Sequence, residues 1–119
     1  MKRYIDGYVL PVPVKNIATY RRMAQKMAKI FREHGALEVY ECVGDDLNVN
    51  FGVPFPRIVK SKPGETVFFS WITFKSRAHR DRVNAKVMKD HRCAEMDHKN
   101  MPFDPKRMGV GGFKVLVAA

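Results

Sequence analysis

The stretch TVFFSWITF, residues 66–74, decides the fold of this chain. It is rich in β-branched and aromatic side chains, the types that favour a strand. Alternate side chains of a strand point to opposite faces, so Phe69 and Trp71 share one face. The opposite face carries Phe68 and Ile72. Because both faces are apolar, both must be covered in the folded protein.

Three further segments have the composition of strands. They are residues 3–13 (RYIDGYVLPVP), 36–43 (ALEVYECV) and 107–117 (RMGVGGFKVLV). Pro11 and Pro13 indicate that the first of them ends at an edge of the sheet or leads directly into a turn. Residues 47–65 are rich in Gly and Pro, and we expect them to form a long excursion between two strands.

Two helices are expected between these strands. Asn16 is placed to cap the first helix, which runs for about eighteen residues. Its apolar residues recur at spacings of three and four and form a stripe along one side: Ile17, Tyr20, Ala24, Met27 and Phe31. Ser76 begins the second helix, which continues to about Asp90 with Val83 and Val87 facing inward.

The resulting order is β-α-β-β-α-β, which predicts one α+β domain over residues 1–119 with a ferredoxin-like sandwich fold. Its four strands form an antiparallel sheet, and its two helices pack on one face. Two helices leave the other face of the strand at 66–74 uncovered, so we expect a second copy of the protein to cover it. Full burial of a Phe or Trp side chain contributes roughly 1.5–3 kcal/mol, so several together can sustain a homodimer.

The composition is that of a globular protein with an excess of positive charge. Of its 119 residues, 45% are hydrophobic, and the formal net charge is +10. The two cysteines, Cys42 and Cys93, form no C-x-x-C pair, which favours a reducing compartment. No stretch approaches the length of an apolar membrane span. We therefore expect a cytoplasmic protein without a membrane partner.

The positive charge is concentrated in the two expected helices. Residues 15–35 and residues 75–91 each carry six basic side chains. One explanation is contact with RNA phosphates, for which the candidates are Arg21, Arg22, Lys26, Arg77, Arg80 and Lys86. The other explanation is a solvated basic face. RNA-binding domains of this topology stack bases on aromatic side chains within a pattern of basic, glycine and aromatic residues, and the third strand lacks that pattern. We therefore favour a solvated basic face over RNA binding.

Two carboxylates, Asp6 and Glu41, occur on strand faces that are otherwise apolar or aromatic. Desolvation there would make them candidate catalytic acids or bases, and pairing with Arg107 or another base is the structural alternative. Tyr8 shares the face of Asp6 and is a candidate for ligand binding. Trp71 is placed to stack on a ligand, with core or dimer packing as the alternative, and Arg107 is placed to neutralise an anionic ligand.

A third candidate for proton transfer is His79, in the first turn of the second helix. Its structural alternative is a partly exposed residue of the capping turn. The one cluster of metal-ligand types comprises His91, Cys93, Asp97 and His98. Its spacing matches no strong zinc pattern, so we predict neither a metal site nor a cofactor.

Several runs occur together and in order along the chain: YIDGYVLPVP, REHGALEVYECVGDD, KPGETVFFSWITFKSRAHRDRVNAKVM and MPFDPKRMGVGGFKVLV. In these runs the chain resembles a bacterial family of unknown function, the YbaA-like proteins. That family is similar to the dimeric α/β-barrel superfamily, which implies two ferredoxin-like protomers facing each other through their sheets. The superfamily includes monooxygenases, haem-degrading enzymes and lactone isomerases, whose ligands usually sit in a pocket between sheet and helices.

The resemblance therefore implies a small-molecule site, but fold likeness assigns no chemistry. The Asn-Trp-His arrangement of the haem-degrading relatives is matched here only at Trp71. Three functions stay open: binding or conversion of a small organic ligand, contact with RNA, and a ligand-free structural or regulatory dimer. The sequence does not decide whether the protein is an enzyme.

Overall fold

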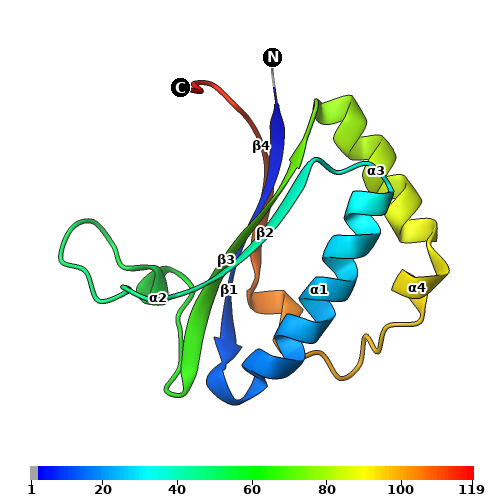
Figure 1. Ribbon diagram of the computed structural model, residues 1–119. Helices are drawn as coiled ribbons and strands as arrows, with labels where there is room; N and C mark the ends of the chain where they lie inside the picture. Colours follow the sequence, from blue (N-terminus) through cyan, green and yellow to red (C-terminus); the bar gives the residue numbers. More distant parts are fainter. Residues whose placement is uncertain (1–2) are drawn as a thin grey trace.

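The computed structural model describes residues 3–119 and contains a four-stranded antiparallel sheet with helices packed mainly on one face (Figure 1). The strands are β1 (Tyr4–Pro13), β2 (Glu38–Val43), β3 (Glu65–Phe74) and β4 (Gly109–Lys114). Their order across the sheet is β2-β3-β1-β4, and every neighbouring pair is antiparallel. The predicted α+β class is confirmed.

The helices are α1 (Ile17–Glu33), α2 (Phe55–Ile58), α3 (Arg77–Lys89) and α4 (His91–Ala94), with 3-10 turns at Val14–Asn16 and Pro105–Arg107. Figure 1 shows α1, α3 and α4 on the same side of the sheet. α2 lies in the long excursion between β2 and β3, which projects away from the other helices (Figure 1). Within the described residues, no helix is long and apolar enough to cross a lipid bilayer.

β1 and β3 are the central strands and pair along their whole length, from Tyr4 opposite Phe74 to Pro13 opposite Glu65. β4 pairs with β1 only as far as Val9. Pro11 and Pro13 therefore lie beyond the end of β4, where β1 is an edge on that side. This agrees with the prediction, because a proline has no backbone N–H to give to a neighbouring strand.

The two predicted helix caps have different outcomes. Ser76 caps α3, since its Oγ accepts a hydrogen bond from the backbone N–H of His79 at 3.1 Å. Asn16 precedes α1, but its side chain makes no cap bond. Its Nδ2 donates instead to the backbone oxygen of Pro102 at 3.0 Å. The helix thus begins directly after Asn16, as predicted, but the predicted side-chain cap is wrong, and Asn16 ties the start of α1 to the segment after α4.

Two buried clusters hold the helices on the sheet. The cluster near α3 contains Ile30, Ala36, Ile72, Phe74, Val83 and Val87. The cluster near the start of α1 contains Leu10, Val12, Tyr20, Ala24 and Phe68. Val83 and Val87 are 1% and 2% exposed, so the predicted inward face of α3 is confirmed.

The sheet face that points away from α1 and α3, which we call the open face, carries a row of aromatic rings in which Tyr40 and Phe69 are exposed and Trp71 is half-buried. The ring of Tyr40 stacks on Trp71 at 5.1 Å between centroids, and Trp71 meets Phe69 edge-on at 5.9 Å. Tyr40 and Phe69 are 48% and 45% exposed, and Phe113 on β4 is 63% exposed. Both faces of β3 are thus apolar, as predicted, and the helices cover one of them.

Candidate functional site

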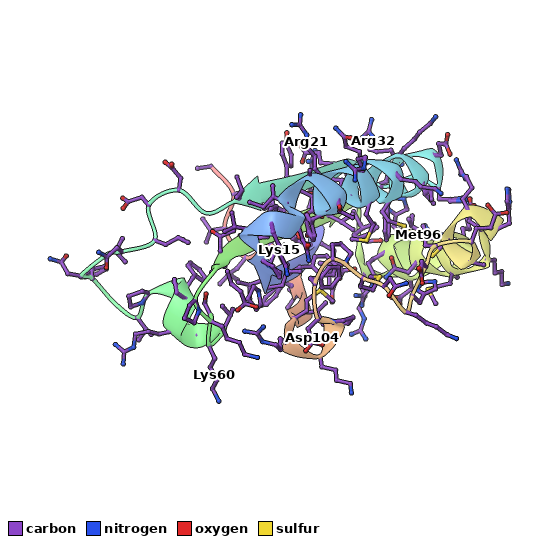
Figure 2. All side chains as sticks on the ribbon, turned by 90° about the horizontal axis from the view of Figure 1, so that it is seen from below. Lys15, Arg21, Arg32, Lys60, Met96 and Asp104 are labelled. Carbon is purple, nitrogen blue, oxygen red and sulfur yellow. The ribbon has the colours of Figure 1, made fainter. Side chains whose placement is uncertain are left out.

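A cavity of about 250 Å³ lies between α1, the sheet and the segment that follows α4. Its walls are mainly apolar and contain five of the chain's seven methionines. They are formed by Tyr8, Leu10, Tyr20, Met23, Ala24, Met27, Ala28, Phe31, Val39, Tyr40, Glu41, Ser70, Trp71, Ile72, Cys93, Met96, His98, Met101, Phe103 and Met108. Figure 2 shows Met96 in the segment after α4 and places Arg21 and Arg32 at the outer side of α1.

Three side chains, Glu41, Tyr20 and Ser70, form what we call the polar corner of the cavity. The hydroxyl of Tyr20 donates a hydrogen bond to Oε1 of Glu41 across 2.7 Å. Tyr20 is buried, whereas Glu41 is exposed as a whole residue, and its carboxylate is the part that is partly withdrawn from water beside Tyr20. Ser70 is buried and lies directly opposite Glu41 on β3.

Burial sets the protonation of the groups in and beside this corner. It raises the pKa of Glu41, while the hydroxyls of Tyr20 and Ser70 oppose the shift because they favour the charged carboxylate. Burial also raises the pKa of Tyr20, and the charge of Glu41 acts in the same direction. The pKa of Tyr8 is raised to about 12, first by burial and then by the charges of Asp6 and Glu41. Both phenols therefore remain protonated at neutral pH, and of these three groups Glu41 is the one that can exchange a proton.

Asp6 lies outside the cavity, between β1 and α3. Its Oδ1 accepts a hydrogen bond from Nη1 of Arg80 at 2.7 Å, and the two side chains are 6% and 18% exposed. Asn84 Nδ2 lies 3.5 Å from the other carboxyl oxygen, and the guanidinium lies 4.9 Å from the centroid of the Tyr4 ring. The base that pairs with Asp6 is therefore Arg80 and not Arg107.

The same pairing removes Arg80 from the surface available to a partner. The other side chains that the sequence offers for RNA phosphates belong to residues that are exposed on α1 and α3: Arg21, Arg22, Lys26, Arg77 and Lys86. The basic surface is therefore real but smaller than the sequence suggests.

His79 and Arg107 are also placed away from the cavity. Nδ1 of His79 accepts a hydrogen bond from the backbone N–H of Lys75 at 2.9 Å, and its ring lies edge-on to Phe74. Burial lowers the pKa of His79, and nearby basic side chains, Lys75 among them, lower it further. Arg107 donates to both carboxyl oxygens of Glu65 at 2.7 and 2.8 Å, which ties the turn before β4 to the start of β3.

The structure thus brings together three of the residues proposed from the sequence. Tyr8, Glu41 and Trp71 line the cavity. The ring of Trp71 belongs to the aromatic row of the open face, on the opposite side of β3 from Ser70 and Ile72. Asp6, His79 and Arg107 serve contacts between elements of the fold instead.

Sequence reasoning missed most of the cavity wall. Tyr20 appears in the sequence only as one apolar residue of a helical stripe, and the methionines are spread from Met23 to Met108. Cys93 and His98 also line the cavity. Nε2 of His98 lies 3.2 Å from the backbone oxygen of Cys93, so the contact of His98 with this residue is to its backbone. Among residues 3–119, no three His, Cys, Asp or Glu side chains are grouped so that they could hold a metal ion.

The chain belongs to the family described as "Protein of unknown function (DUF1428)", whose model matches residues 3–105. The uncharacterized protein YbaA of Escherichia coli strain K12 is 42% identical over 115 residues, which cover 97% of each chain. YbaA of Shigella flexneri is similar to the same degree. Among solved structures, the de novo designed protein Foldit4 is 9% identical with a TM-score of 0.44 over 99% of this chain and 100% of its own. That likeness is too weak to support a conclusion.

Proposed function

We propose that this protein binds a small, largely apolar organic molecule in the cavity between α1 and the sheet. The observation that carries the proposal is the cavity itself, which has apolar walls and a single polar corner at Glu41 and Tyr20. Sites for small organic ligands have this composition, because apolar walls supply affinity and a few polar groups fix the orientation.

The polar corner also gives the bound molecule one group with which to exchange a proton. Burial raises the pKa of Glu41, and general acids and bases work best when their pKa lies near the working pH. We assign binding to the cavity and leave the class of reaction unassigned, because proton exchange is common to many reactions.

The binding test uses the fluorescent apolar probe N-phenylnaphthylamine together with native mass spectrometry of protein purified from cells. Ala28 lines the cavity on α1, and Ala18 is exposed on the same helix. We expect Ala28→Leu to fill the cavity and weaken probe binding at least about tenfold, whereas Ala18→Leu should leave it unchanged. Equal probe binding in both variants, with no small-molecule mass on the purified protein, would overturn the proposal.

We further infer that the chain is a ferredoxin-like protomer and that two copies meet through their open faces as a dimeric α/β barrel. The strand order β2-β3-β1-β4 supports the first inference, since it follows from the split βαβ plan. The exposed aromatic row supports the second, since a contiguous apolar patch is typical of an interface.

The dimer is tested by analytical ultracentrifugation at micromolar concentration. Phe69 belongs to the aromatic row, where its ring lies edge-on to Trp71, and Phe51 is 92% exposed on the excursion between β2 and β3. We expect Phe69→Lys to give monomers and Phe51→Lys to remain dimeric. A wild-type monomer, or a Phe69→Lys dimer, would contradict the inference.

Contact with RNA is a second proposal, supported by exposed basic side chains on α1 and α3 such as Arg21 and Lys26. Binding through several phosphates should weaken by at least about a hundredfold between 50 and 200 mM salt. A filter-binding titration of a mixed RNA oligomer against salt, repeated with Arg21→Gln, measures this. Binding that does not change with salt concentration or with the Arg21→Gln substitution would count against the RNA proposal.

A further inference from the structure

The sign of the charge in the cavity lining is opposite to the sign of the net charge of the whole chain. The protein carries 22 lysines and arginines against 12 acidic residues, yet among residues 3–119 no Lys or Arg lines the cavity. Glu41 is the one carboxylate of the lining. A charged ligand group at the polar corner would therefore meet a negative charge, although the outer surface of the protein is positive.

The walls beside that carboxylate are aromatic. Tyr20, which binds Glu41, also lies edge-on to Phe103 at 5.7 Å between ring centroids. Tyr8 and Phe31 add two further rings to the lining. The faces of aromatic rings attract cations, and they do so most strongly where water is excluded. A carboxylate next to several rings is thus a chemically consistent environment for a cation with an apolar body.

We propose that the cavity selects hydrophobic cations, such as a protonated amine or a quaternary ammonium group attached to a single ring or a short chain. This inference rests on the proposed ligand-binding function and narrows its ligand class. A protonated amine would donate to Glu41 in a charge-assisted hydrogen bond, while its apolar body lies among the methionines. Methionine side chains are flexible and polarisable, so they can fit bodies of different shape.

The groups that face Glu41 set how the preference should change with pH. Tyr20 on α1 and Ser70 on β3 stay neutral, and Tyr8 on β1 stays protonated. Arg21 lines the adjoining groove beside α1, which Glu41 and Tyr20 also line, and it is absent from the lining of the cavity itself. His98 lines the cavity from the segment after α4. The amine itself keeps its charge below about pH 9. As the pH falls, Glu41 takes up a proton and loses its charge, so binding of the amine should weaken.

The experiment is isothermal titration calorimetry with three probes of the same skeleton: phenylbutylamine, phenylbutanol and phenylbutanoate. We expect the amine to bind about tenfold to a hundredfold more tightly than the alcohol at pH 7.5, the difference that a hydrogen bond to a charged group supplies. The butanoate should bind most weakly. The preference for the amine should decrease as the pH is lowered to about 5.

The variants are Glu41→Gln and, as a matched control, Glu38→Gln. Glu38 lies on the same strand at a position of the opposite sheet face, and its substitution changes the net charge equally. In Glu41→Gln the amine and the alcohol should bind within about threefold of each other, while Glu38→Gln should keep the preference.

The outcomes separate this inference from the proposed function. Equal binding of the three probes, tightest binding of the butanoate, or an amine preference that survives in Glu41→Gln would overturn the cation inference and leave ligand binding in place. If none of the three probes binds while N-phenylnaphthylamine does, the cation inference fails alone. If no probe of either kind binds, both fail.

Discussion

The substitution Asp6→Asn tests the buried ion pair that joins β1 to α3. In the wild type, Asp6 and Arg80 are 2.7 Å apart at their nearest atoms, and their side chains are 6% and 18% exposed. Asparagine has almost the same shape as aspartate, so the change removes the charge and leaves the packing. The guanidinium would then lie next to a neutral amide in a poorly solvated position.

Coulomb's law gives the size of the effect. Two unit charges about 4 Å apart attract each other by about 4 kcal/mol at an effective dielectric constant of about 20. Arg80 retains other partners, since its Nε donates to Asp81 at 2.8 Å and its guanidinium lies over the ring of Tyr4. Loss of one partner of a buried pair typically costs 3–5 kcal/mol, so we expect about 3 kcal/mol for Asp6→Asn. For a chain of this size that lowers the melting temperature by roughly 10 °C.

The assay is urea denaturation monitored by circular dichroism, with Glu38→Gln as the control. Glu38 pairs with Arg3 at 3.8 Å, and both side chains are more than 40% exposed, so its loss should cost less than about 1 kcal/mol. The double variant Asp6→Asn with Arg80→Met should lose less than the sum of the two single variants, because the two side chains interact. A loss below about 1 kcal/mol for Asp6→Asn, or strict additivity, would refute the reasoning.

Two further predictions concern other contacts of the fold. Arg107 lowers the pKa of Glu65 to about 2, so its stabilising effect is complete above the usual glutamate pKa of about 4.3 and is lost as the pH falls towards 2. Glu65→Gln should therefore destabilise the protein in urea denaturation at pH 7 and make little difference near pH 2; an equal loss at both values would contradict this. A Cβ at Gly112 would collide with the hydroxyl of Tyr4, whereas one at Gly111 would make only an ordinary contact. Gly112→Ala should cost about 1–3 kcal/mol and Gly111→Ala less than about 0.5 kcal/mol by the same assay, and equal values would show that Tyr4 moves freely.

Much of the fold follows from the sequence, because local patterns determine it. The alternation in β3, the spacing along α1 and the serine at the start of α3 each act over a few residues, and all three recur in the structure. The hydrogen bond of the Asn16 side chain cannot be predicted from local patterns, because its partner, Pro102, is far away in the chain. The predicted last strand is longer than β4, which pairs only from Gly109 to Lys114.

The site is less predictable, because it depends on which elements meet. The face on which Glu41 lies can be deduced from the strand period, but its hydrogen bond to Tyr20 depends on how α1 crosses β2. Asp6 occupies an equally apolar strand, and only the packing of α3 decides that Arg80 neutralises it. Two similar carboxylates thus acquire different environments from contacts between elements that local patterns do not specify.

The two faces of β3 bear on function together. Interiors of proteins are normally filled, and a hollow lined by apolar side chains gives up packing energy. A row of aromatic rings left in water lacks the stabilising free energy that burial of the rings would contribute, and such a patch favours association. This chain has both features on successive residues of one strand, with Ser70 and Ile72 at the cavity and Phe69 and Trp71 in the aromatic row. A domain with only a structural role would be more stable without either, whereas a protein that binds a ligand on one side and a second copy on the other needs both.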